Sequence, residues 1–129
     1  MTDASNMLFS GTDSYLRAAM SGLAARQRAI ANNVANVDTP GFKASEVRFE
    51  DALKSAIGRG TGAKLDQASL NAAASRSTLV DATTSRADGN NVDIDREMEL
   101  LGEANLNYSA MTQLMATRLG ILRNVINGR

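Results

Sequence analysis

The chain has 129 residues, with 14 basic and 14 acidic side chains and neither Cys nor His. The balanced charge argues against the basic surface with which nucleic-acid binders displace counterions from phosphates. The missing Cys and His exclude thiolate nucleophiles, imidazole bases, disulfides and almost every zinc site. We therefore expect no nucleic-acid partner, no catalytic residue, no metal and no cofactor.

The apolar content is mostly aliphatic, because aromatic residues make up 4% of the chain and hydrophobic residues 43%. Such a composition favours helix packing over a dense globular core. The first residues, Met1 to Phe9, have neither the basic segment nor the long apolar segment of a Sec signal peptide. No apolar stretch approaches the roughly 20 residues of a membrane-spanning helix, so we expect no direct membrane insertion. From the residues alone we expect a soluble cytoplasmic protein. The absence of Cys agrees equally well with an exported protein that avoids stray disulfides.

The first predicted helix runs from about Asp13 to Val37. Its apolar positions alternate in steps of four and three residues, the repeat of a coiled-coil seam, with one polar interruption at Gln27. The helix should end before Pro40, because the residue before a proline is pushed out of the α region. Pro40-Gly41 then has the residue order of a type II turn.

The middle of the chain, about residues 44–91, is expected to be largely irregular and flexible. It contains the Gly-rich stretch Gly58 to Gly62, an Ala/Ser-rich stretch and a polar run, and its large apolar residues are few and irregularly spaced. Such a segment has little apolar surface with which to offset the entropy of ordering, so we expect it to be poorly suited to covering an apolar face. We expect a hinge in the Gly-rich stretch, a short helical turn around Phe49 to Ile57, and at most a brief strand or two.

The second predicted helix runs from near Asp93 to about Asn127. Asp93 can cap its first turn, the acidic residues that follow suit the positive end of the helix dipole, and Gly128 can stop it. The preceding run from Asp88 has the spacing of an EF-hand loop. However, Val92 stands where that loop needs an oxygen ligand and Asp93 where it needs Gly, so a turn followed by a helix cap is favoured over calcium.

Two rows of apolar residues follow the second helix, and one partner helix cannot cover both. We call the first row, together with its expected partners on the first helix, the assembly seam. The assembly seam comprises Leu16, Leu23, Ile30 and Val34 with Met98, Leu101, Tyr108, Met115, Leu119, Leu122 and Ile126. The second row comprises Leu100, Met111, Leu114, Ile121 and Val125. Because a broad exposed apolar surface marks an interface, we expect the second row to contact other subunits; the alternative is an ordinary hairpin covered by the middle segment.

These patterns predict a mostly α fold. Long N- and C-terminal helices would pair as an antiparallel coiled-coil-like hairpin, joined by an irregular, flexible middle. Residues 1–43 and 92–129 would form one domain, and residues 44–91 a variable segment.

The most specific motif closes the first helix, where residues 31–43 fit the pattern ANNxANxxTPGFK. Its members are Asn32, Asn33, Asn36, Thr39, Pro40, Gly41 and Phe42. From the residues alone it is a well-terminated helix, whose Asn side chains can fix register through hydrogen bonds. The pattern resembles the signature of the flagellar basal-body rod and hook proteins. The run from Asp88 to Met98 and the apolar helix after it resemble the C-terminal part of a proximal rod protein, with the C-type proximal rod protein as the nearest alternative.

The resemblance implies a structural subunit of the bacterial flagellar rod, not an enzyme. Such a subunit would assemble with copies of itself and with other rod proteins, from the base of the rod at the MS ring and export gate, into the periplasm-spanning drive shaft. It would leave the cell through the flagellar type III export apparatus without cleavage. Phe49 and Leu53 resemble the FxxxΦ segment that such subunits present to the export gate, and one turn of amphipathic helix is the alternative. A cytoplasmic coiled-coil adaptor or chaperone would fit the heptads equally well.

Overall fold

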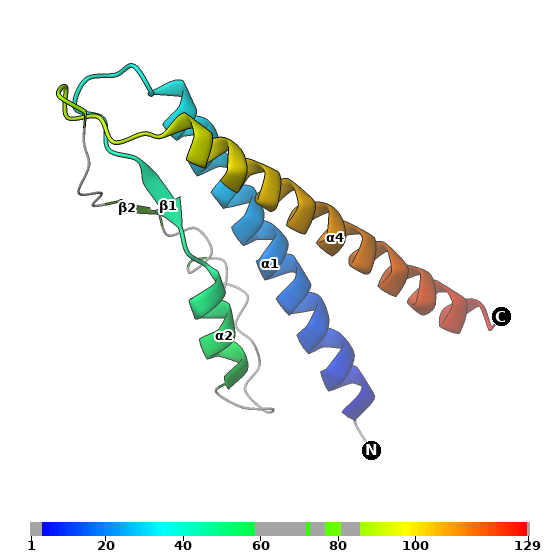
Figure 1. Cartoon of the computed structure of the whole chain (residues 1–129). Helices are drawn as coiled ribbons and strands as arrows, with labels where there is room; N and C mark the ends of the chain where they lie inside the picture. The colour runs from blue at the N-terminus through cyan, green and yellow to red at the C-terminus, as the bar shows by residue number, and fades with distance from the viewer. Residues whose placement is uncertain (1–3, 59–71, 73–76, 81–85, 129) are drawn as a thin grey trace.

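Two long helices dominate the computed structural model, which describes residues 4–58, 72, 77–80 and 86–128 (Figure 1). The elements in chain order are α1 (Ala4–Ala35), β1 (Ser45–Val47), α2 (Glu50–Gly58), β2 (Ser77–Leu79) and α4 (Ile94–Asn127). The prediction of a mostly helical fold with long terminal helices is confirmed. Within the described residues, no helix has both the length and the apolar character needed to cross a membrane.

Helices α1 and α4 form an antiparallel hairpin. They lie closest where the connecting loops are and separate toward the two termini (Figure 1). We call the first part, residues 30–37 of the chain with residues 90–101, the closed end. The open end comprises residues 11–20 with residues 114–127. An ion pair between Asp13 and Arg118 and a hydrogen bond between Gln27 and Asn105 connect the two helices outside the closed end.

The boundaries of α4 follow from local chemistry. The side chain of Asp93, in extended backbone conformation, accepts hydrogen bonds from the backbone N–H groups of Asp95 and Arg96. At the other end Gly128 adopts the left-handed conformation, with φ of 65°, and its N–H group donates to the carbonyls of Asn124 and Val125. Both predicted boundaries of this helix are confirmed.

Helix α1 begins at Ala4, well before the predicted start at Asp13. No proline interrupts residues 4–12, so the helix extends upstream at little cost. Asp13 lies inside the helix and pairs with Arg118. The predicted start was therefore wrong, because the apolar repeat from which it was taken begins only at Leu16.

The core lies between α1 and the segment that follows it. Strands β1 and β2 pair antiparallel, with Ser45 opposite Leu79 and Val47 opposite Ser77. The buried cluster comprises Ala18, Ala19, Leu23 and Ala25 of α1 with Val47, Phe49 and Leu53. The middle segment thus covers one face of α1 over residues 47–53, which corrects the expectation that it is unsuited to covering anything. The predicted helical turn is confirmed as α2, whereas residues 59–62 of the expected hinge lie outside the described residues.

Candidate functional site

The motif that closes α1 forms a type II turn. Gly41 has φ of 72°, a conformation that glycine adopts without strain, and the N–H group of Phe42 donates to the Thr39 carbonyl at 3.2 Å. Pro40 supplies the fixed φ that the preceding position needs. The turn predicted from Pro40-Gly41 is therefore confirmed, and it directs the chain back along α1 toward β1.

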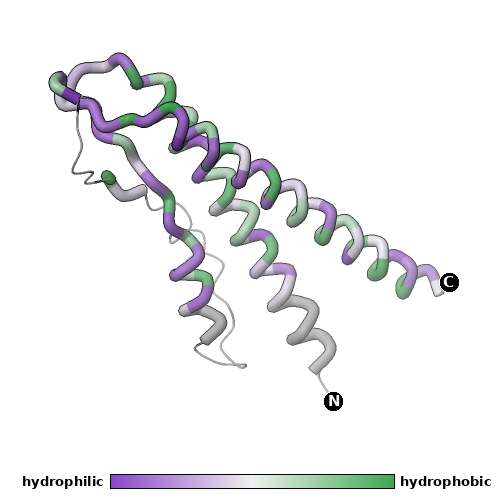
Figure 2. Tube along the Cα trace, in the orientation of Figure 1, coloured by the Kyte–Doolittle hydropathy of each residue, from purple (hydrophilic) through white to green (hydrophobic). Residues whose placement is uncertain are grey.

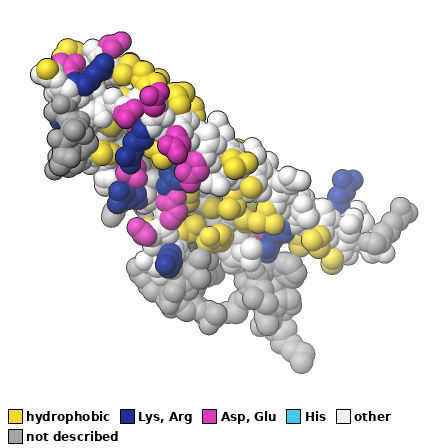
Figure 3. All heavy atoms as spheres, viewed as in Figure 1, with side chains coloured by type: hydrophobic (Ala, Val, Ile, Leu, Met, Phe, Trp, Pro, Cys, Tyr) yellow, Lys and Arg dark blue, Asp and Glu magenta, His cyan; other side chains and the backbone are white. Residues whose placement is uncertain are grey.

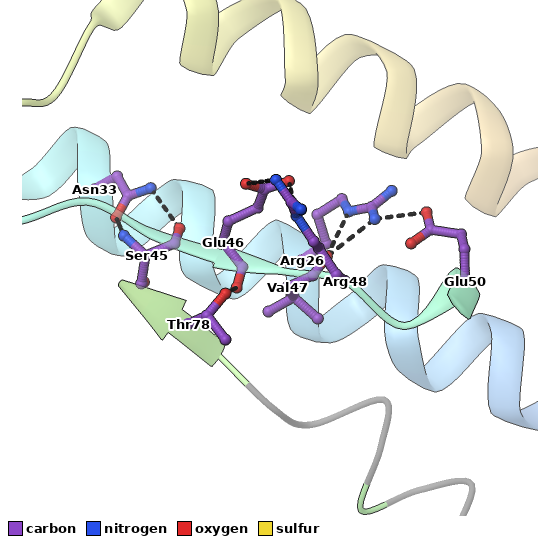
Figure 4. Close-up of polar contacts among 8 residues, drawn as sticks. All are labelled: Arg26, Asn33, Ser45, Glu46, Val47, Arg48, Glu50 and Thr78. Carbon is purple, nitrogen blue, oxygen red and sulfur yellow. Dashed lines mark hydrogen bonds and ion pairs between the residues drawn. The ribbon is translucent and has the colours of Figure 1, made fainter. Parts of the chain in front are cut away.

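Asn33, one of the motif residues, joins the end of α1 to β1. Its side chain is 1% exposed and pairs with both backbone groups of Ser45: Nδ2 donates to the carbonyl and Oδ1 accepts from the N–H group, each at 2.9 Å (Figure 4). Arg26, earlier in α1, donates from Nε and Nη2 to the Val47 carbonyl at 3.2 and 2.9 Å. These two side chains hydrogen-bond backbone groups of Ser45 and Val47 on the edge of β1 that does not pair with β2.

Asn90 ties the start of α4 to the end of α1. It is completely buried, and its Nδ2 lies within hydrogen-bond distance of the carbonyls of Asn36, Val37 and Thr39, at 2.9, 3.1 and 2.8 Å. Its Oδ1 accepts from the Val92 N–H group at 2.8 Å. One amide thus binds three carbonyls of the turn that follows α1, two of which also accept backbone hydrogen bonds within that turn.

Neighbouring residues extend this connection. Oδ1 of Asn91 accepts from the Ala44 N–H group at 2.6 Å, and Nδ2 donates to Val80 at 2.8 Å. Arg86 donates to the Val37 carbonyl and Lys43 to the Gly89 carbonyl, both at 2.8 Å. We call residues 36–44 and 86–92, joined by these hydrogen bonds, the polar clasp. The residues that fill the suspected EF-hand loop therefore bind the backbone of the motif. Within the described residues there is no group of three or more acidic side chains arranged to hold a metal ion.

Glu97 is a buried charge on the first turns of α4. It is 6% exposed, one carboxylate oxygen has no hydrogen-bond partner, and Asn33 hydrogen-bonds the carboxylate. Burial raises the pKa of Glu97 above its ordinary value, and the hydrogen bond from Asn33 and the nearby Arg96 oppose the rise. Glu97 lines a groove of about 700 Å³ between α1, β1 and the start of α4. Glu97 is one of the acidic residues expected near the positive end of the helix dipole, and the structure shows in addition that it is buried.

The two residues of the possible export segment lie in the core. Phe49 is 6% and Leu53 7% exposed. The Phe49 ring packs on Gly22, where a Cβ atom would come within 2.3 Å of it, and the guanidinium of Arg26 lies 5.0 Å from the ring centroid. Arg26 also forms an ion pair with Glu50 (Figure 4). In the folded chain this segment is structural.

The members of the predicted assembly seam differ in how far they are buried. On α1, Leu16, Leu23 and Ile30 are buried and Val34 is half-buried. On α4 the half-buried members are Leu101, Tyr108, Met115 and Leu122, whereas Met98, Leu119 and Ile126 are 45%, 55% and 81% exposed. Glu97 and Ala104 are buried on the same helix, so the face toward α1 is rotated from the predicted row.

The residues of the second row also differ in how far they are buried. Leu100 and Met111 are half-buried, whereas Leu114, Ile121 and Val125 are 52%, 54% and 73% exposed. Leu114 and Ile121 share a groove of about 230 Å³ with Leu16. Hydrophobic residues continue along α4 into its C-terminal part (Figure 2), and charged side chains are denser around β1 and the nearby helices than toward the open end (Figure 3). The role of either row in assembly stays a prediction.

Sequence reasoning missed the residues whose partners are distant in the chain. Asn90 contacts carbonyls more than 50 positions earlier, and Asp13 pairs with Arg118. The Asn-Asn pair at residues 90–91, repeating the Asn-Asn pair of the motif, was a signal that could have pointed to the clasp. Asn36 and Thr39, which were predicted, contribute backbone carbonyls to it. Asn32 is exposed and contributes its carbonyl to the turn of the helix.

Comparisons with known proteins agree on one family. Residues 16–43 match the profile of the family described as "Flagella basal body rod protein". The chain is 35% identical over 125 residues to the flagellar basal body rod protein FlgB of Bacillus subtilis, covering 94% of this chain and 97% of that protein. It is 40% identical over 119 residues to FlgB of Borrelia hermsii, covering 73% of this chain and 79% of that protein. It is 30% identical over 118 residues to FlgB of Salmonella typhimurium, covering 81% and 85%.

Proposed function

The chain belongs to the flagellar basal body rod protein family, among the proximal rod proteins named FlgB, and from this premise we propose how it contributes to the rod. It is a structural protein of the motility apparatus and not an enzyme, and its family implies assembly with other rod proteins. The C-type proximal rod protein and the cytoplasmic adaptor are thereby set aside. Our proposal is that the apolar side chains left exposed on α4 pack against neighbouring rod subunits.

The exposed apolar surface of α4 carries this proposal. Its members on the open end are Leu114, Leu119, Ile121, Val125 and Ile126, all more than half exposed. Removing such a surface from water stabilises an interface by roughly 25 cal/mol per Å² of apolar area. A contact that is heterologous and does not close generates a helical tube, so copies of this chain and other rod proteins would extend the shaft.

The paired terminal regions would act as the assembling unit. We propose that residues 1–43 and 92–129 form one domain and that residues 44–91 are a variable segment attached to it. The hydrogen bond between Gln27 and Asn105 and the ion pair between Asp13 and Arg118 support the first part, because they connect residues 1–43 directly to residues 92–129. The seam residues that face α1 would hold the hairpin, and the exposed seam residues would join the second row at the interface.

Substitutions at the exposed row test the assembly surface. Ile121→Asp should abolish rod formation and swimming, while the free energy of unfolding of the isolated chain changes by less than about 0.5 kcal/mol, since the side chain is exposed. Ser109→Asp introduces the same charge at another exposed position of α4 and should leave swimming intact. Normal swimming by the Ile121→Asp strain would contradict the proposed interface.

Two leucines on the seam separate assembly from folding. Leu119→Asp should behave as Ile121→Asp does, because Leu119 is 55% exposed. Leu122→Asp should abolish rod formation and also destabilise the isolated chain, because Leu122 is half-buried. Urea denaturation of the two variants measures the difference, and equal stabilities would argue against the observed orientation of α4.

For location, we propose a place at the base of the periplasm-spanning rod, by the MS ring and export gate, reached through the flagellar type III apparatus without cleavage. Phe49 and Leu53 would be presented before folding, since both are buried afterwards. Phe49→Ala should lower export, measured as secreted protein. Leu23→Ala, which removes a side chain from the same core, is the control that should not. Equal export of the two variants would contradict a role for the segment.

A further inference from the structure

One ion pair lies between the helices of the hairpin at its open end. Oδ1 of Asp13 is 2.8 Å from Nε of Arg118, and the side chains are 29% and 17% exposed. Each of the other two ion pairs among the described residues has one partner that is more than half exposed. A pair this deep loses hydration when it forms, so its net contribution to stability is small, and a pair of apolar residues could replace it without loss.

A second polar contact fits the same alignment of the helices. Nε2 of Gln27 donates to Oδ1 of Asn105 at 2.7 Å. Gln27 follows Asp13 in α1, and their partners Asn105 and Arg118 are separated in α4 by the same number of residues to within one. The two contacts therefore specify one antiparallel register.

The apolar residues alone do not specify that register. Both helices repeat apolar positions in steps of four and three, so a shift of one heptad, about 10 Å at 1.5 Å per residue, presents an equally apolar face. The shift would place Asp13 against Met111 or Val125, and burying an unpaired charge there costs several kcal/mol on general grounds. Only the observed register, among these, places the opposite charge of Arg118 beside Asp13.

We propose that the Asp13–Arg118 ion pair, supported by Gln27 and Asn105, is a specificity device: it selects the chain's own α4, in this register, as the partner of the open half of α1. The polar clasp holds the helices together only at the closed end. In a rod, neighbouring subunits would offer similar apolar helices to the same α1, and this consequence rests on the proposed assembly. Polar contacts within an apolar seam are suited to excluding such wrong partners.

Charge reversal in separate chains tests the selection directly. One chain carries Asp13→Arg and Met20→Cys, and the other carries Arg118→Asp and Met111→Cys. Each chain alone then places like charges together, whereas the mixture can pair Arg at 13 of one chain with Asp at 118 of the other. Met20 lies midway between Asp13 and Gln27, and Met111 about midway between Asn105 and Arg118, so a disulfide reports the observed register. Because the natural chain has no Cys, each of these chains carries one thiol, and the disulfide between the two different chains is distinguished by mass from the two that join identical chains.

We expect the disulfide between the two different chains to be the major product of this mixture, separated on non-reducing gels and identified by its mass. A mixture of Met20→Cys and Met111→Cys chains with natural charges should give it only as a minor product. A single chain with Asp13→Arg, Arg118→Asp and both Cys residues should form the intrachain disulfide, which shows that the reversed pair still folds and selects its own helix. Equal interchain yields with natural and reversed charges would overturn the proposal. These measurements use chains in solution, so their failure leaves the motility test of the proposed interface unaffected.

Discussion

The closed and open ends of the hairpin consist of the same two helices, yet they are stabilised by different interactions. At the closed end, side-chain amides such as Asn33 and Asn90 are buried and hydrogen-bonded to the backbone. At the open end one ion pair connects the helices, and Ile121, Val125 and Ile126 remain largely exposed. The difference indicates that buried amides fix how the helices meet at the closed end, while the open end leaves apolar side chains of α4 uncovered.

Removing the amide of Asn90 should have the largest effect on the isolated chain. Asn90→Ala leaves three backbone carbonyls and the Val92 N–H group without that partner, in a fully buried position. The three carbonyls keep other donors, from Thr39, Arg86 and Phe42, so the Val92 N–H group is the one left unsatisfied. At about 1–3 kcal/mol for such a buried group, with smaller losses at the carbonyls, we expect a loss of about 2–4 kcal/mol in the free energy of unfolding. Asn32→Ala, at an exposed Asn of the same motif, should cost less than about 0.5 kcal/mol. Urea denaturation that finds similar losses for both would remove the distinction between the two ends.

A second test compares two glycines of the long helices. A methyl group at Gly22 would enter the Phe49 ring, so Gly22→Ala should destabilise the chain by about 1–3 kcal/mol, as overpacking does. Nothing lies within 4 Å of the corresponding position at Gly102, so Gly102→Ala should stabilise α4 by up to about 1 kcal/mol. Thermal unfolding should therefore shift in opposite directions. Stabilisation by Gly22→Ala would mean that Phe49 does not pack on α1.

The smallest effect we expect is a pH dependence that comes from Glu97. Burial raises the pKa of this carboxyl, so the folded chain binds the proton more tightly than the unfolded chain. This contribution to stability is complete below the ordinary glutamate pKa of about 4.3 and is lost as the pH rises through the raised value. Glu97→Gln should flatten that part of the pH profile of the unfolding free energy. An unchanged profile would mean that Glu97 is solvated at the closed end.

Features that depend on neighbouring residues were predictable from the sequence. Asp93 and Gly128 mark the ends of α4 because a cap acts on its own helix, and Pro40-Gly41 marks the turn because both residues restrict their own backbone. The start of α1 was not predictable in this way, because the apolar repeat that located the helix begins only at Leu16, and the partner of Asp13 is the distant Arg118.

The orientation of α4 could not be read from hydrophobicity. Glu97 and Arg118 face α1 because Asn33 and Asp13 provide partners there, whereas a pattern of apolar residues assigns charges to the solvent side. Met98 and Leu119 are consequently turned outward. The clasp was missed for the same reason: Asn90 has no local role, and its acceptors become neighbours only when the two ends of the chain meet.

Hydrogen exchange of the isolated chain, compared with the same chain in the rod, tests the central claim most directly. The account predicts slow exchange in the isolated chain for backbone amides near Asn33 and Ala104, and fast exchange for those from Leu119 to Asn127, where few side chains are covered. In the rod both groups should exchange slowly. Equal protection of both ends in the isolated chain would contradict the claim that the open end is completed by its neighbours.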